Sequence, residues 1–186
     1  TCVWIDIGPG TNTVRLDNVG LINGGIGVRM DSVSDEPAGE DPGRPLFLIA
    51  NDLEIDFPHS HAIALLRGEE VQLSNCYIQG SLTSSGLLLG PDWNSEFMMT
   101  NSRVFGHTTG AGAEIMGGAH AVLTNNIIGA NKIGILVHGG VSDFIIQGNH
   151  IGDIFKGSGT TSQAHGVQIQ AGASDRYVVV SNTLTG

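Results

Sequence analysis

The sequence is poor in basic residues. Lys and Arg together number 8, against 18 Asp and Glu, which gives a formal net charge of −10 at pH 7. Nucleic acids and anionic membrane surfaces are bound through clusters of positive charge, so we expect neither as a partner. The chain also lacks an uninterrupted apolar run of the length that a transmembrane helix needs. We therefore predict no insertion into a membrane.

Aromatic residues are scarce as well, at 5%, so the core is predicted to be aliphatic. Hydrophobic residues make up 40% and charged residues only 14% of the 186 residues, which excludes disorder driven by charge. A chain of this length can bury a core, and we predict one domain over residues 1–186. Because the sequence begins with Thr1 and shows no signal-peptide pattern, we interpret it as a fragment of a longer chain.

Cysteines are few. For Cys2 and Cys76 we expect two buried, reduced thiols, although the sequence leaves a disulfide between them open. Glycine, in contrast, is abundant at 28 residues, about twice ordinary usage.

Seven segments repeat one pattern, in which a short β-type run, an Asn and a second short run follow one another. Successive Asn residues are separated by 33, 24, 26, 24, 24 and 33 positions. Short apolar stretches flanked by Gly lie between them, and no segment of helical length keeps a 3.6-residue period without Gly. The segments are VRLDNVGLI (14–22), FLIANDLEI (47–55), VQLSNCYIQG (71–80), FMMTNSRVFG (97–106), AVLTNNIIGA (121–130), IIQGNHIGD (145–153) and VVVSNTLTG (178–186).

A period near 24 residues that holds strands and turns fits a parallel β-helix. A leucine-rich repeat needs an L-x-x-L-x-L frame, which is absent, and a propeller blade needs about 40 residues. In a β-helix each strand stacks on its equivalent in the next coil, about 4.8 Å away. We therefore predict an all-β fold, a single-stranded parallel β-helix with about 24 residues per coil.

The recurrent Asn is predicted to be structural. Asn adopts the left-handed conformation more readily than most residues, and stacked amides can hydrogen-bond as a ladder from coil to coil. The predicted ladder is Asn18, Asn51, Asn75, Asn101, Asn125, Asn149 and Asn182. Alternation along the strands predicts these inward-facing residues: Val71, Leu73, Leu87, Leu89, Phe97, Met99, Ala113, Ile115, Ala121, Leu123, Ile135, Val137, Val167 and Ile169.

The repeat resembles the right-handed parallel β-helix of the pectin-lyase-like superfamily. Residues 145–186, with GNHIGD (148–153) and SNTLTG (181–186), are especially similar to the β-helix shafts of bacteriophage tail spikes and tail fibres. The resemblance implies a right-handed coil and a homotrimer that binds, and often cleaves, host-surface polysaccharide. It also implies other virion tail proteins as partners and a location in the virion tail, outside the host cell.

Two alternatives stay open beside the tail-spike interpretation. One is a polysaccharide-active enzyme of the same superfamily, a lyase, glycoside hydrolase or epimerase, which would be secreted. The other is a purely structural solenoid spacer. The sequence lacks the catalytic motifs typical of polygalacturonases, pectate lyases and alginate epimerases. If the chain is an enzyme, we expect a glycan depolymerase of the hydrolase or lyase type.

Ionisable residues recur at the turn after each apolar strand, and stacking of the coils is expected to align them as one edge. Glycosidic cleavage needs two nearby carboxylates, and a Trp ring can contact the apolar face of a sugar. PDWNSE (91–96) therefore supplies the predicted catalytic residues Asp92 and Glu96. A solvated acidic turn, with Trp93 covering the core, is the alternative. The predicted substrate-binding residues are Trp93, Glu114, His120, His138 and Asp143.

Three further features of the sequence lead to predictions. His59, His61 and His107 are expected as exposed turn residues, and no metal or cofactor is predicted because His59 and His61 lack a third ligand. An outward apolar stripe is predicted to be an oligomer contact, and chance exposure of single apolar residues is the alternative; the stripe consists of Leu88, Leu136 and Met116. Loops are predicted to leave the rod at residues 31–45 and 154–164.

Overall fold

The computed structural model describes residues 2–6, 13–31, 47–81, 83–93, 95–117, 120–153, 163–172 and 174–185. Every regular element in these ranges is a β-strand. The described residues therefore contain no helix that is long and apolar enough to cross a membrane. Nearly all of the two predicted loops, at 31–45 and 154–164, lies outside the described residues.

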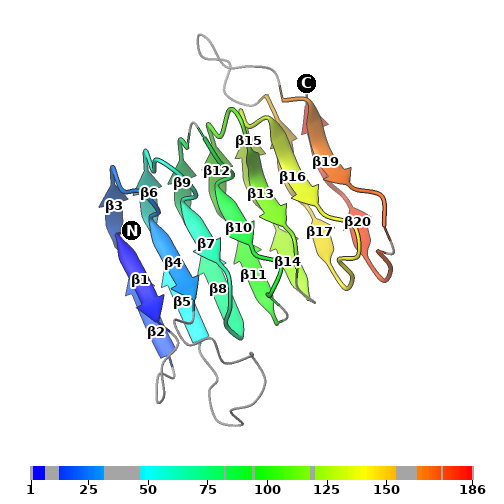
Figure 1. Cartoon of the computed structure of the whole chain (residues 1–186). Coiled ribbons are helices and arrows are strands. Elements are labelled where there is room, and N and C mark those ends of the chain that lie inside the picture. Colours follow the sequence, from blue (N-terminus) through cyan, green and yellow to red (C-terminus); the bar gives the residue numbers. More distant parts are fainter. Residues whose placement is uncertain are drawn as a thin grey trace.

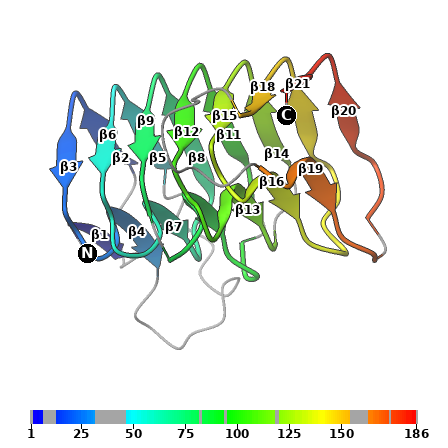
Figure 2. The ribbon, with the colours of Figure 1, turned by 90° about the horizontal axis from the view of Figure 1, so that it is seen from above.

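The strands form three parallel sheets of seven strands each, which we call A, B and C. The chain visits them in this order once per coil, and consecutive coils stack along the rod from blue to red in Figures 1 and 2. Sheet A contains β1 (Val3–Asp6), β4 (Val28–Asp31), β7 (Ile63–Leu65), β10 (Leu87–Leu89), β13 (Ala111–Ile115), β16 (Ile133–Val137) and β19 (His165–Ile169). Sheet B contains β2 (Thr13–Asp17), β5 (Phe47–Asn51), β8 (Glu70–Ser74), β11 (Phe97–Thr100), β14 (Ala121–Thr124), β17 (Ile145–Gln147) and β20 (Val178–Val180). Sheet C contains β3 (Gly20–Ile22), β6 (Glu54–Asp56), β9 (Tyr77–Gln79), β12 (Arg103–Phe105), β15 (Ile127–Gly129), β18 (His150–Gly152) and β21 (Thr183–Thr185).

The register confirms the predicted coil length. Leu87 pairs with Ile63, 24 positions earlier, and with Ala113, 26 positions later. The coils that contain residues 32–46 and 154–162 are longer, since Thr13 pairs with Phe47 and Ile133 pairs with His165. The prediction of a parallel β-helix is therefore confirmed.

The core fills the space between the three sheets. The predicted inward-facing residues from Val71 to Val137 are buried, because alternate side chains of each strand point into the coil. Val167 and Ile169 are only partly buried, since β19 pairs with β16 alone among the described strands. Aliphatic side chains dominate this core, as the composition predicts.

Each turn from sheet B to sheet C consists of two residues, of which the first is left-handed. Four residues of the predicted ladder occupy this position with φ between 51° and 56°, and they are Asn18, Asn75, Asn101 and Asn125. Asn51 instead ends β5, one residue before Asp52, which has a φ of 54°. Asn149 and Asn182 come one residue later, after Gly148 and Ser181. A single ladder through all seven Asn residues was therefore wrong, because the coils place Asn at different positions of the turn.

The hydrogen-bonded ladder runs through the second residue of this turn, which points into the coil. Backbone and side-chain N–H groups of Asn126 donate to Asn149 Oδ1 over 2.9 and 3.0 Å, and Asn149 donates to Asn182 Oδ1 in the same way. Ser102 N donates to Asn126 Oδ1 over 2.9 Å. Asn126 Nδ2 also donates to the Met99 carbonyl. This inner ladder therefore supplies buried backbone groups with partners, which stabilises the turn.

A second internal ladder follows sheet C, at the turn back to sheet A. Ser81 N donates to His107 Nδ1 over 3.2 Å, and His107 N donates to Asn131 Oδ1 over 3.0 Å. His107 is fully buried, so the expectation that it is an exposed turn residue was wrong. Burial, with a smaller contribution from the charge of His61, lowers the pKa of His107 to about 4. It therefore serves the fold as a neutral hydrogen-bonding residue.

The two cysteines lie in different surroundings. Cys76 is buried at the inner position of a B-to-C turn, and burial raises the pKa of its thiol. Cys2 is exposed, which contradicts the expectation that both are buried, and both thiols are free.

Candidate functional site

Five ionisable residues form a column along one edge of sheet B, at its turn from sheet A. Backbone bonds join neighbouring coils here, from Val71 N to the Glu96 carbonyl and from Phe97 N to the His120 carbonyl. Sequence reasoning expected such an edge, and the structure aligns its members one per coil. We call this set the charged column: Glu70, Glu96, His120, Asp143 and Arg176.

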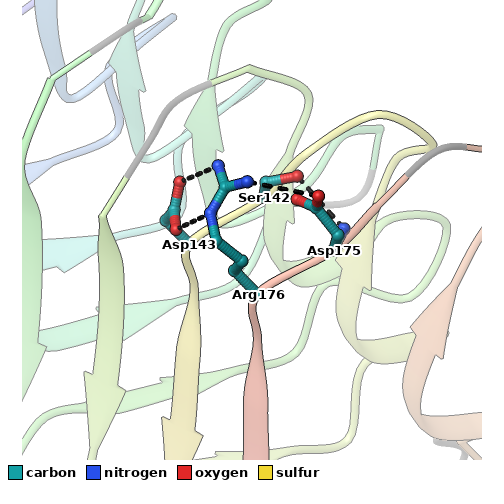
Figure 3. Close-up of polar contacts among 4 residues, drawn as sticks. All are labelled: Ser142, Asp143, Asp175 and Arg176. Atoms are coloured by element: carbon teal, nitrogen blue, oxygen red, sulfur yellow. Dashed lines mark hydrogen bonds and ion pairs between the residues drawn. The ribbon is translucent and has the colours of Figure 1, made fainter.

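The last two members of the charged column form a bidentate ion pair, which Figure 3 shows. Arg176 Nε and Nη2 donate to the two oxygens of Asp143, each over 2.7 Å. The Arg176 guanidinium lowers the pKa of Asp143, and the charge of His120 adds to this effect. Ser142 Oγ accepts from Asp175 N beside the pair, so the two turns are joined at several points. A negative and a positive group are thereby held in fixed positions on the outside of the rod.

PDWNSE divides between surface and core. Asp92 and Glu96 are both exposed. Trp93 is 1% exposed, and its Nε1 donates to the Ser95 carbonyl over 3.0 Å. The prediction that Trp93 contacts substrate was wrong, because the ring fills the core beneath the turn and has no open face.

Glu114 and His138 form a second polar group, on the outer face of sheet A. Glu114 Oε1 lies 3.0 Å from His138 Nε2, and Ser85 Oγ donates to Glu114 Oε2 over 2.6 Å. A Ser–His–acid triad requires the imidazole between the hydroxyl and the carboxylate, whereas here the carboxylate lies in the middle. This arrangement orients Glu114 but does not activate Ser85 as a nucleophile.

The predicted apolar stripe on sheet A is interrupted. Leu88 pairs in register with Glu114, which pairs with Leu136, so a carboxylate separates the two leucines. The continuous outward apolar strip lies instead on sheet B, where each member pairs with the next. The sequence-based prediction missed it because it considered outward residues only on the apolar strands flanked by Gly, which form sheet A. The apolar strip is Met98, Val122, Ile145 and Val178, of which Met98 and Val178 are 45% and 43% exposed.

The histidines at the opposite edge do not form a metal site with their neighbours. His61 Nδ1 lies 3.1 Å from the Ser85 carbonyl, and His59 is exposed. Within the described ranges, no group of three His, Cys, Asp or Glu side chains is arranged to hold a metal ion.

The strands of successive coils stack into three parallel sheets, with polar ladders inside and aligned side chains outside. These features define a β-helix protein. The family model described as a right handed beta helix region matches residues 43–186. The chain therefore belongs to the right-handed β-helix family. Comparisons with curated proteins and with solved structures gave no match.

Proposed function

We propose that this chain is the β-helix of a bacteriophage tail spike or tail fibre that recognises polysaccharide on the host surface. The charged column is the observation that carries the proposal. Its members recur once per coil rise, about 4.8 Å, which is comparable to the length of one sugar unit in an extended glycan. Carboxylates, an imidazole and a guanidinium provide the acceptors and donors that sugar hydroxyls need. The similarity of residues 145–186 to phage shafts supports the viral assignment.

The ion pair between Asp143 and Arg176 favours recognition along the charged column, because it holds two of the five members in place. Glu96 and His120 are exposed, whereas Asp143 is held by Arg176. Side chains that are fixed before binding lose less conformational entropy when a ligand arrives. Because the charged column has one member in each coil, a long glycan can contact several coils at once.

We propose a homotrimer in which the apolar strip of sheet B packs against other copies of the chain. The strip lies beside the charged column, which places the glycan contacts next to the boundary between subunits. Met98→Asp puts a charge into this contact, and we expect light scattering to give the mass of one chain instead of three. Met116→Asp, at an exposed residue that directly follows β13, is the matched control and keeps the trimer. A wild-type monomer, or a trimer in the Met98→Asp variant, contradicts this assembly.

Glycan cleavage is the second candidate function. Glu70 and Glu96 lie in neighbouring coils, and a spacing of one coil rise is close to the roughly 5–5.5 Å between the carboxylates of retaining glycosidases. The predicted residue Asp92 lies in the same turn as Glu96. This alternative requires release of new reducing ends, and that release has to be lost in Glu96→Gln or Asp92→Asn.

The experiment is capture of the wild-type protein on a panel of immobilised bacterial capsular polysaccharides and O-antigens. We expect at least one glycan to bind, and Glu96→Gln to bind it about tenfold more weakly, the equivalent of about 1.4 kcal/mol. Asp17→Asn, an exposed carboxylate outside the charged column, serves as control. Absence of binding across the panel supports the spacer alternative and contradicts the proposal.

A further inference from the structure

The outer face of sheet C gathers three aromatic rings in successive coils. Tyr77 and Phe105 have ring centroids 5.0 Å apart and an angle of 80° between their planes. Phe57 directly follows β6 in the preceding coil. These rings lie outside the core and outside the charged column.

Polar side chains alternate with the rings on this face. Tyr77 pairs in register with Arg103, and Gln79 pairs with Phe105, so the rings occupy one diagonal of a square and the polar groups the other. Tyr77 donates its hydroxyl to Gln79 Oε1 over 3.1 Å, which leaves the Gln79 NH2 group as a donor. Arg103 is exposed. The square therefore presents apolar surface and hydrogen-bond donors side by side.

Two carboxylates border the square on its other side. Glu54 and Asp56 of β6 pair in register with Tyr77 and Gln79. Glu54 is exposed and Asp56 is half-buried. Asp56 supplies acceptors next to Gln79, whereas Tyr77 separates Glu54 from Arg103. The two carboxylates together carry more negative charge than the one guanidinium of Arg103 carries positive charge.

Phe57 combines two unfavourable features. Its φ is 51° and its side chain is 53% exposed. A left-handed backbone is unusual for a bulky residue, and exposure of the ring leaves apolar surface in water. The ring lies against Gly80, where an added Cβ would be 3.3 Å from Phe57 Cδ1. The same turn position is left-handed at Asn23, Gly80, Gly106 and Ala130, so the coil imposes this backbone, and Phe57 is the bulkiest of the five residues that occupy it.

We propose that Phe57, Tyr77, Gln79, Arg103 and Phe105 form a second glycan-binding surface, which takes neutral pyranose rings. The proposal rests on the proposed function, and it adds a site separate from the charged column. The aromatic rings contact the C–H face of the sugar, while Gln79, Arg103 and Glu54 bind its hydroxyls. Neutral sugars fit because this face carries two carboxylates and one guanidinium, so its net negative charge repels a polyanionic glycan.

The test is calorimetric titration with oligosaccharides cut by mild acid from the polysaccharide that the wild type captures. We expect two classes of site. Phe57→Ala and Arg103→Ala each weaken one class by about tenfold, while Glu96→Gln weakens the other. Both substituted side chains are exposed, so thermal unfolding is expected to match the wild type. Ile22→Ala, an apolar residue of sheet C that is 63% exposed, and Arg15→Ala are the matched controls.

The outcomes separate the two proposals. A single class that is weakened only by Glu96→Gln overturns the sheet C surface and leaves the proposed function standing. A single class of site whose affinity is weakened only by Phe57→Ala and Arg103→Ala supports the sheet C surface and shows that the charged column does not bind the glycan. Absence of any binding by the wild type contradicts both.

Discussion

The inner ladder and the charged column are both stacks of polar side chains, one per coil, yet they differ in their hydrogen bonds. In the inner ladder, Asn126 and Asn149 satisfy one another and nearby backbone groups. In the charged column, Glu96 and His120 are exposed to solvent. A polar column that satisfies itself holds the fold, whereas one that keeps donors and acceptors outside can bind a ligand. Hydrogen bonds therefore distinguish the ladder that stabilises the fold from the column that we propose as a binding surface.

The largest expected effect follows from breaking the inner ladder. Asn126→Ala removes the acceptor of Ser102 N–H and the donor to the Met99 carbonyl, both in the interior. Unsatisfied buried groups cost about 1–3 kcal/mol each, so we expect a loss of about 4 kcal/mol in the free energy of unfolding by urea. Asn125→Gly, at the adjacent left-handed position, keeps the backbone conformation and is expected within about 1 kcal/mol of wild type. Equal stability of the two variants contradicts the role of the ladder.

A smaller effect is expected from the second internal ladder in acid. The pKa of His107 is about 4 in the folded protein and 6.5 ordinarily. Between these values the unfolded chain binds a proton that the folded chain does not, so stability falls as the pH drops from about 6.5 to about 4. The pKa difference corresponds to about 3 kcal/mol.

The variant that tests this pH dependence is His107→Asn, because Asn131 already occupies the equivalent position in the next coil. Its unfolding free energy is expected to lose this dependence between pH 6.5 and 4. His59→Asn, an exposed histidine, retains the wild-type slope. An unchanged slope in His107→Asn argues against His107 as its source.

The smallest effect is expected in the charged column. Arg176→Gln removes the guanidinium that lowers the pKa of Asp143, so this pKa is expected to rise in a carbon-13 titration of the carboxyl group. Stability changes little because exposed ion pairs contribute little. Arg15→Gln, which lies outside the charged column, leaves the Asp143 titration as in wild type. An unmoved Asp143 pKa in Arg176→Gln contradicts the bidentate pair.

The fold follows from the sequence because its signals are periodic. Strand alternation identified the core, and the Asn spacing identified the coil. The exact turn position did not follow, since Asn suits both the left-handed outer position of Asn125 and the inner position of Asn149. The role of Trp93 was also predicted wrongly, because a Trp beside acidic residues is equally compatible with contact to a sugar ring and with filling the core. The pairing of Tyr77 with Arg103 follows from the repeat, since each lies two residues after its Asn, but the outward residues of these strands were not included in the prediction.

The most direct test is to measure affinity and thermal stability together for one outer and one inner variant. The probe is the polysaccharide that the wild type captures, and the variants are Glu96→Gln and Asn126→Ser, since Ser102 holds the equivalent inner position one coil earlier. We expect Glu96→Gln to lose affinity at unchanged melting temperature. We expect Asn126→Ser to melt at lower temperature and to bind as wild type while folded. The reverse pattern, or loss of both properties in both variants, contradicts the division between an inner scaffold and an outer binding surface.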